Sequence, residues 1–292
     1  MLTRPAGRCA WQSSPNKLAE SDALVRHPLV RRIGFTGAVS TGLAIQRAAA
    51  RSAVKHVSLE LGGKNPFIVF PDADLDKVVE FAVSGMNFSW AGQSCGSTSR
   101  LLLHEAVHDE VVERVAARLR ALKLGDPLDP SSEMGPVNSA RQHVRVMGFI
   151  ASAREQGARL VTGGGRPPGS NFERGYWVEP TLYDGVDASM RVAREEIFGP
   201  IICALRWRSE EEALALANGS ELGLTAAVWT RELNTALRVM RRLEAGTVWI
   251  NSAGPHFVGT PFGGWKDSGL GSEECLGELL SYTQVKAVHV LP

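Results

Sequence analysis

The stretch RIGFTGAVSTGLAIQRAAARSAVKHVSLELGG, residues 32–63, decides the fold class of this chain. Its first residues have the composition of a short buried strand that ends at Gly37. Residues 41–53 are rich in Ala, Leu and Ile and predict a helix, and residues 57–61 predict a second strand. Strand, glycine turn, helix and strand in this order form one unit of an α/β fold.

The same alternation continues along the rest of the chain. Asp74 precedes a helical segment as a capping residue. The predicted strands cover 67–70, 101–104, 159–161, 176–178, 201–205, 226–229 and 247–251, and the predicted helices cover 75–90, 107–121, 141–155, 210–218 and 234–243. This alternation predicts an open, mostly parallel α/β sheet with flanking helices.

The two ends of the chain differ from the middle. Residues 1–22 have no apolar period, and we expect a poorly ordered leader there. Residues 254–271 are rich in glycine, which predicts a loop. Residues 282–290 alternate apolar and polar side chains, as an edge strand does, and such a strand invites pairing with another chain.

Composition limits the classes of partner. The 292 residues are 44% hydrophobic, enough for a buried core, and 32 basic and 31 acidic residues give a net charge of +1. This balance favours neither nucleic acid nor a membrane surface, and no apolar run is long enough for a membrane span. The four cysteines are scattered without a CxxC pair, so the sequence indicates no disulfide framework and no metal site, and a cytoplasmic location fits.

Cys95 is the first candidate for chemistry. A lone cysteine is more often an inert buried side chain than a nucleophile. This one lies in Gly92-Gln-Ser-Cys-Gly-Ser, where small residues leave backbone amides free to approach a reacting oxygen. Cys203, by contrast, lies inside an apolar strand. The context therefore favours a thiolate nucleophile at Cys95.

Glu60 is the second candidate. It lies at the end of a predicted strand, between Leu59 and Leu61. A carboxylate there is either poised in a cleft or paired with a cation such as Lys64. In the first case it can act as a general base for the thiol or for a water molecule.

The turn at residues 35–42, Phe-Thr-Gly-Ala-Val-Ser-Thr-Gly, joins a strand to a helix. Free amides at the helix start, together with the helix dipole, can bind a phosphate group. An ordinary turn explains the same residues, because the segment does not match GxGxxG.

Taken together, the motifs resemble those of the aldehyde dehydrogenase superfamily, in content and in order. They are Leu59-Glu-Leu-Gly-Gly-Lys, Gly92-Gln-Ser-Cys, Glu195-Glu-Ile-Phe-Gly-Pro and Pro261-Phe-Gly-Gly-Trp-Lys-Asp-Ser-Gly. The resemblance runs from about residue 23 to residue 290. It implies an aldehyde dehydrogenase-like catalytic domain together with part of a Rossmann-like cofactor domain.

The resemblance also implies a mechanism and its residues. Cys95 would attack an aldehyde to form a thiohemiacetal, a hydride would pass to NAD or NADP, and Glu60 would activate water to hydrolyse the thioester. Glu196 would hold the nicotinamide ribose, Phe198 would lie near the nicotinamide ring, and Gly37 would lie beside the cofactor pyrophosphate. The Cys95 amide would supply half of an oxyanion hole.

The resemblance further predicts the organisation of the chain. Residues 1–22 would be the leader, 23–62 a remnant of the dinucleotide-binding domain, 63–275 the catalytic domain, and 276–292 a carboxy-terminal strand that forms a homo-oligomer. Members of the family carry a long amino-terminal portion that supplies most of the cofactor sheet. We therefore expect an amino-terminally truncated chain with an incomplete cofactor site.

Three functions are compatible with these expectations. The first is NAD(P)-dependent oxidation of a small-molecule aldehyde to a carboxylic acid. The second is a catalytically incompetent remnant that acts only through oligomerisation. The third is a cofactor-independent thiol esterase that keeps Cys95 as nucleophile and Glu60 as base.

Overall fold

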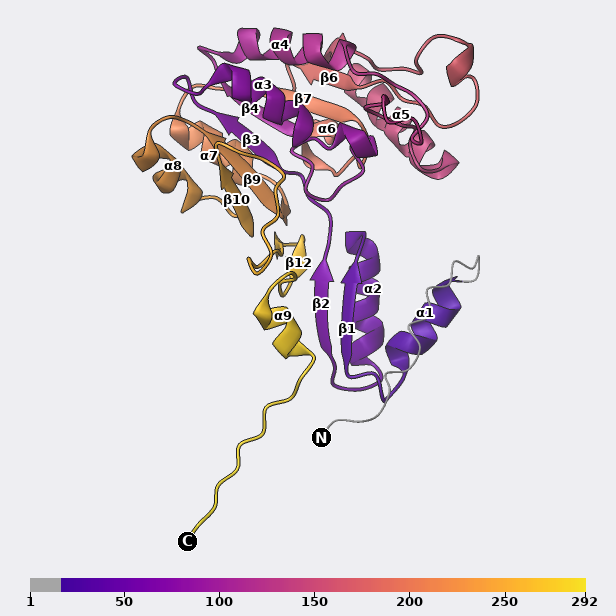
Figure 1. Ribbon diagram of the computed structural model, residues 1–292, viewed down its shortest axis with the longest axis vertical. Helices are drawn as coiled ribbons and strands as arrows, with labels where there is room; N and C mark the ends of the chain where they lie inside the picture. The colour runs from indigo at the N-terminus through magenta and orange to yellow at the C-terminus, as the bar shows by residue number, and fades with distance from the viewer. Residues whose placement is uncertain (1–16) are drawn as a thin grey trace.

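A computed structural model describes residues 17–292 and contains a large and a small sheet (Figure 1). The seven strands of the large sheet lie in the order β10-β9-β3-β4-β7-β6-β5. Each neighbouring pair is parallel except β6 and β5, which are antiparallel at one edge. The bounds are β3 Pro66–Val69, β4 Arg100–His104, β5 Arg159–Thr162, β6 Thr181–Asp184, β7 Ile201–Trp207, β9 Thr225–Trp229 and β10 Thr247–Ile250. The predicted open, mostly parallel sheet is confirmed.

Helices cover both faces of the large sheet, so its strands are apolar on both sides. Phe67 and Val69 of β3 pack with α3 (Leu75–Ser84) and α4 (His108–Arg120). Ile68, between them, points into the opposite core. That second core contains residues of α5 (Ala140–Glu155), α6 (Arg191–Arg194), α7 (Glu210–Asn218) and α8 (Leu233–Met240).

Several helices begin where a side chain caps the first free amides. Asp74 accepts a hydrogen bond from the amide of Lys77 at the start of α3, as the sequence predicts. Ser139 accepts one from Gln142 at the start of α5. The helix predicted over 75–90 ends earlier, at Ser84, and a separate 3-10 turn covers Phe88–Trp90.

The small sheet consists of β1 (Arg32–Thr36), β2 (His56–Glu60) and β12 (Gly269–Leu270). Strands β1 and β2 are parallel and are joined by helix α2 (Val39–Ala50), which confirms the unit read from residues 32–63. Strand β12 pairs antiparallel with β2, although it lies within the range expected to belong to the catalytic domain. In Figure 1 this sheet lies below the large one. The link between them is the short segment from β2 to β3, which contains Gly62 and Gly63.

Helix α1 (Lys17–Arg26) begins inside the stretch expected to be a poorly ordered leader, so residues 17–22 differ from that expectation, and residues 1–16 lie outside the described residues. One predicted strand is wrong. Residues 176–178 form no strand. They belong to a loop whose Trp177 and Val178 side chains are buried, and β6 begins only after Pro180.

Residues 282–290 are expected to form an edge strand by pairing with another chain, and within the single chain they form none. A strand needs a neighbour for its N–H and C=O groups. The described chain offers none there, because β12 already pairs with β2 and the tail extends away from both sheets (Figure 1). Helix α9 (Leu276–Ser281) precedes this tail, and the remaining short strands β8 (Leu222–Gly223) and β11 (Trp265–Lys266) pair with each other.

The start of the tail is attached to the small sheet. The Arg32 guanidinium donates hydrogen bonds to the hydroxyls of Ser281, at 2.8 Å, and Tyr282, at 3.1 Å. The guanidinium carbon also lies 3.8 Å from the centre of the Tyr282 ring, a cation–π contact. Across residues 17–292, no helix has the length and apolar character required to cross a membrane.

Candidate active site

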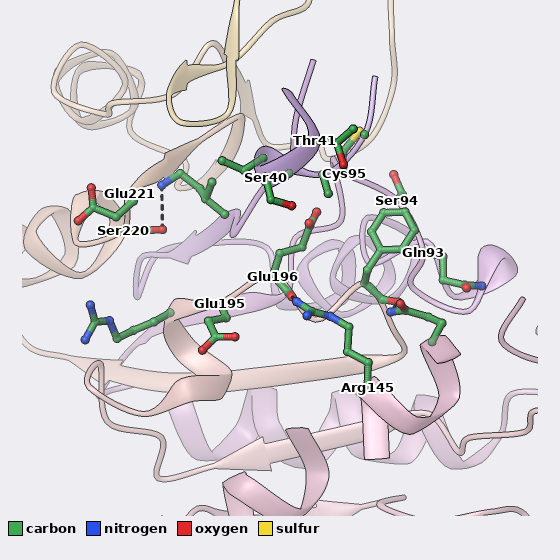
Figure 2. Close-up of a pocket in the computed structure, with 18 of the residues that line it drawn as sticks. Ser40, Thr41, Gln93, Ser94, Cys95, Arg145, Glu195, Glu196, Ser220 and Glu221 are labelled. Carbon is green, nitrogen blue, oxygen red and sulfur yellow. Dashed lines mark hydrogen bonds between the residues drawn. The ribbon is translucent and has the colours of Figure 1, made fainter. Parts of the chain in front are cut away.

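A cleft of about 1530 Å³ lies where the two sheets meet. Its walls come from the start of α2, the loop around Cys95, helix α5 and the segments 194–198 and 219–222. Figure 2 shows Ser40 and Thr41 of α2, Cys95, and Glu196 arranged around this cleft. The end of a strand, a helix start and a glycine-rich loop therefore share one cavity, as in many ligand sites of α/β proteins.

Cys95 reaches the cleft from the loop that follows the 3-10 turn. Ala91 and Gly92 both have a left-handed backbone, with φ of 52° and 66°, which turns the chain sharply before the loop. A side chain at Gly92 would overlap the backbone of Gly199, so this position requires glycine. The sequence prediction that small residues open this loop agrees with the structure. The N–H of Cys95 donates to no acceptor within residues 17–292.

Glu60 reaches the same cleft from the end of β2, the middle strand of the small sheet. It is 3% exposed, and its Oε1 has no hydrogen-bond partner among the described residues. The structure gives no ion pair between Glu60 and Lys64. Lys64 is itself buried, and this burial lowers the pKa of its amine to about 8.

Burial changes the proton affinities of both candidates. It raises the pKa of the Glu60 carboxyl from 4.5 to about 7, and the nearby Cys95 thiol opposes part of the rise. Burial also raises the pKa of the Cys95 thiol to about 12, and the negative charge of Glu60 adds to the rise. At neutral pH the thiol is therefore protonated while Glu60 is close to half-ionised. This arrangement suits transfer of the thiol proton to the carboxylate.

Glu196 also lines the cleft and is held close to the segment between the sheets. The amide of Gly63 donates to its Oε1 at 3.1 Å. A Cβ at Gly62 would lie 2.4 Å from its Oε2, so only glycine permits this approach. Burial raises the pKa of the Glu196 carboxyl. Two side chains of α5 fix the backbone beside it, because Arg145 donates to the Glu196 carbonyl at 2.6 Å and Gln142 donates to the Phe198 carbonyl at 2.7 Å.

Phe198 also lines the cleft and has a left-handed backbone, with φ of 58°. Such a backbone is uncommon for a bulky residue and marks a position that its neighbours determine. Phe198 and Glu196 thus face the same cavity as Cys95, as the sequence resemblance implies.

The start of α2 offers free donors to the cleft. The Gly37 amide is already used, because it donates to the Glu60 carbonyl at 3.0 Å. The capping position is Ala38, whose side chain makes no capping hydrogen bond. The amides of Val39 and Ser40 have no acceptor within residues 17–292. These donors and the helix dipole suit an anionic group, and the whole cleft is large enough for a dinucleotide.

Sequence reasoning missed three residues of this region. Asn65, Gln142 and Arg145 carry no motif signature of their own, and only the folded chain brings them next to Cys95, Phe198 and Glu196. The position of Asn65 immediately after the Leu-Glu-Leu-Gly-Gly-Lys motif is the one signal available in the sequence. Lys266, in the last of the four motifs, donates to the carbonyls of Asn218 and Ser220.

The fold and the cleft define an α/β protein in which a loop cysteine and a buried glutamate face a dinucleotide-sized cavity. Residues 15–288 match the aldehyde dehydrogenase family, and the chain belongs to this family. It is 49% identical to aldehyde dehydrogenase tropH of Talaromyces stipitatus over 272 residues, which are 92% of this chain and 53% of that protein. It is 43% identical to betaine aldehyde dehydrogenase of Mesorhizobium japonicum, covering 91% of this chain and 54% of the relative.

Solved structures show the same likeness. The betaine aldehyde dehydrogenase of Staphylococcus aureus, solved in complex with NAD+, is 38% identical and superposes with a TM-score of 0.87. The superposition covers 90% of this chain and 52% of that one. The chain therefore spans about half the length of the curated relatives it matches.

Proposed function

We propose that this chain carries the catalytic centre for NAD(P)-dependent oxidation of an aldehyde to a carboxylic acid. The observation that carries the proposal is that Cys95 and Glu60 line one cleft with the free amides at the start of α2. Membership of the aldehyde dehydrogenase family supports the same reaction.

Cys95 is the nucleophile in this proposal. Its thiol gives a proton to Glu60, and the sulfur forms a bond to the aldehyde carbon. The carbonyl oxygen becomes an oxyanion, which the free N–H of Cys95 can stabilise. Because burial and Glu60 keep the thiol protonated at rest, the proton transfer accompanies attack rather than precedes it.

Glu60 is the general base for the second half of the reaction. A bound NAD or NADP would supply the acceptor for the hydride of the thiohemiacetal carbon. Glu60 first releases the thiol proton to solvent, and the resulting thioester on Cys95 is then hydrolysed by a water that gives its proton to Glu60. Its pKa of about 7 suits a group that must gain and lose a proton near neutral pH.

The residues of the cleft fit such a cofactor. Glu196 would accept hydrogen bonds from ribose hydroxyls, and Phe198 would provide an apolar wall for the nicotinamide. The amides of Val39 and Ser40 would donate to the pyrophosphate, beside Gly37. We assign residues 23–62 to the cofactor side and 63–275 to the catalytic side, with β12 returning to the cofactor side.

The test is turnover of a panel of aldehydes by the purified chain with NAD and with NADP, followed by the absorbance of the reduced cofactor. Cys95→Ala should abolish turnover, and Glu60→Gln should lower it strongly, because both the attack and the hydrolysis lose their proton acceptor. Cys275→Ala is the matched control, since Cys275 is a half-buried thiol that does not line the cleft. A folded chain that neither binds cofactor nor oxidises any aldehyde would contradict the proposal.

Hydrolysis of an activated ester without cofactor reports on Cys95 and Glu60 alone. If ester turnover persists and aldehyde turnover is absent, the thiol esterase function replaces the dehydrogenase. If the folded chain shows neither, the oligomerising remnant is the better description.

We also propose that the tail, 282–290, pairs with a second copy of the chain. Its support is an extended backbone with exposed apolar side chains, among them Val285, Val288 and Val290. Removal of 283–292 should lower the mass of the assembly measured by light scattering. An unchanged assembly would contradict this pairing.

A further inference from the structure

We infer that the buried side chain of Asn65 is a positioning residue that fixes the peptide after Cys95 and thereby aims the thiol and the amide of Cys95 into the cleft. The inference rests on the proposed role of Cys95 as nucleophile. No sequence motif assigns a role to Asn65.

The carboxamide of Asn65 forms hydrogen bonds with the loop that contains Cys95, here called the nucleophile loop, and with one strand. Its Nδ2 donates to the carbonyl oxygens of Cys95, at 2.7 Å, and Ser97, at 2.9 Å. Its Oδ1 accepts from the amide of Thr225, the first residue of β9, at 3.0 Å. Two donors and one acceptor in a fixed plane therefore connect the loop to the large sheet.

The side chain of Asn65 is buried and closely surrounded by backbone. Asn65 is 1% exposed, so water does not compete for its hydrogen bonds. Its own carbonyl accepts from the amide of Arg100, and β3 begins at the next residue, Pro66. A Cβ at Gly63 would lie 2.3 Å from the Cys95 carbonyl oxygen and 2.5 Å from Asn65 Oδ1. Glycine at that position permits the close approach.

The carbonyls on either side of Cys95, those of Ser94 and Gly96, accept longer hydrogen bonds. The amide of Ser97 donates to the Ser94 carbonyl at 3.2 Å, and the Thr225 hydroxyl reaches the Gly96 carbonyl at 3.4 Å. Without the Asn65 bonds, the peptide between Cys95 and Gly96 can rotate, since Gly96 has no side chain to hinder it. Rotation of that peptide alters the direction of the sulfur that is to attack.

The decisive variant is Asn65→Asp, which has nearly the same shape. Its ionised carboxylate still accepts from Thr225, but its second oxygen faces two carbonyl oxygens and cannot donate. Protonation restores one donor, and burial beside two carbonyls raises the pKa of the introduced carboxyl. The variant should therefore recover partly as the pH falls.

The measurement is the rate at which iodoacetamide alkylates Cys95, read by peptide mass spectrometry from about pH 6 to about pH 9. Cys275 in the same sample is the internal reference for general loosening. We expect Asn65→Asp to react about tenfold more slowly than the wild type at the alkaline end. The ratio of the two rates should approach one at the acidic end, and kcat should fall with the aldehyde KM unchanged.

Asn218→Asp is the matched control. Its Nδ2 donates to the Arg242 carbonyl at 2.8 Å and its Oδ1 accepts from the Glu244 amide at 2.9 Å. Neither bond involves the nucleophile loop, so the ratio to wild type should stay near one at every pH. If Asn65→Asp does not fold, Asn65→Ser, which keeps one donor, should show the slower alkylation at Cys95 alone.

A folded Asn65 variant with wild-type alkylation at every pH would overturn the inference. So would a parallel increase in the labelling of Cys275, since that would indicate general loosening. If Cys95→Ala retains aldehyde turnover, the proposed function itself fails, which is a separate outcome.

Discussion

The hydroxyl of Ser268 donates a hydrogen bond of 2.6 Å to the carbonyl oxygen of Gly62. The Oγ of Ser268 also accepts a hydrogen bond from the Gly223 amide at 2.9 Å, and Ser268 is 0% exposed. One hydroxyl thus connects the segment between the sheets to the loop that ends in β12. The bond keeps Gly62 where Glu196 approaches it.

Ser268→Ala should lower the free energy of unfolding by about 1–3 kcal/mol, because a buried carbonyl and a buried amide both lose their partner. Urea unfolding followed by tryptophan fluorescence measures the change. Ser84→Ala, at the exposed end of α3, is the control and should stay within about 0.5 kcal/mol of the wild type. Equal stability of the two variants would argue against a role for Ser268 in joining these segments.

Removing the charge of Glu60 should make Cys95 more reactive at rest. The pKa of the thiol is raised first by burial and then by the Glu60 carboxylate. In Glu60→Gln the second cause disappears, so the rate of alkylation should begin to rise at lower pH than in the wild type. Iodoacetamide rates from about pH 7 to about pH 10 test this. A profile displaced to higher pH would show that Glu60 activates the resting thiol instead.

Glu60 should also make stability depend on pH. Its folded pKa of about 7 lies above the ordinary 4.5, so its stabilising contribution is complete below about pH 4.5 and is lost as the pH rises through 7. At pH 8, Glu60→Gln should be more stable than the wild type by on the order of 2 kcal/mol. Denaturant unfolding at both ends of this range measures the difference.

Part of the pH slope should remain in Glu60→Gln, because burial raises the pKa of Glu196 in the same direction. Glu155→Gln, an exposed position on α5, should leave the whole profile unchanged. Identical slopes in the wild type and Glu60→Gln would contradict the assignment of the raised pKa to Glu60.

Gly62→Ala should weaken cofactor binding without disabling the thiol. The added Cβ would lie 2.4 Å from Glu196 Oε2, so the carboxylate must move and its bond to Gly63 is lost. We expect KM for NAD to rise about tenfold while alkylation of Cys95 changes less than about twofold. Gly148→Ala is the control, since its Cβ would meet nothing within 4 Å. A larger effect on Cys95 than on KM would contradict this role of Gly62.

The local pattern of apolar and polar residues was sufficient to predict most helices and strands. The helix over 210–218 is found as α7 with the same bounds, because Ser209 caps it and the acidic first turn suits the helix dipole. The strand predicted over 176–178 is wrong, because a short run of buried apolar residues next to a proline has the same sequence pattern in a loop as in a strand. The tail, 282–290, has the alternation of an edge strand but no neighbouring strand within the single chain, so it forms none there.

The residues of the site also fall into two groups, those that the sequence predicts and those that it does not. Motifs in the sequence identified Cys95 and Glu60, and the structure brings both to one cleft. Arg145 and Asn65 were missed because their contacts join segments far apart in the chain, and no local pattern encodes such a contact. The raised pKa of Glu60 was likewise out of reach, because it arises from burial in the completed fold.

Strand β12 has a consequence for the order in which the protein is made. Glu60 lies on β2 and pairs with Gly269 of β12, which comes 209 residues later, as positions 60 and 269 show. The small sheet can therefore close around Glu60 only after β12 has been synthesised. Contacts of such long sequence separation form late in folding. Until β12 pairs with β2, the strand that carries Glu60 has an open edge.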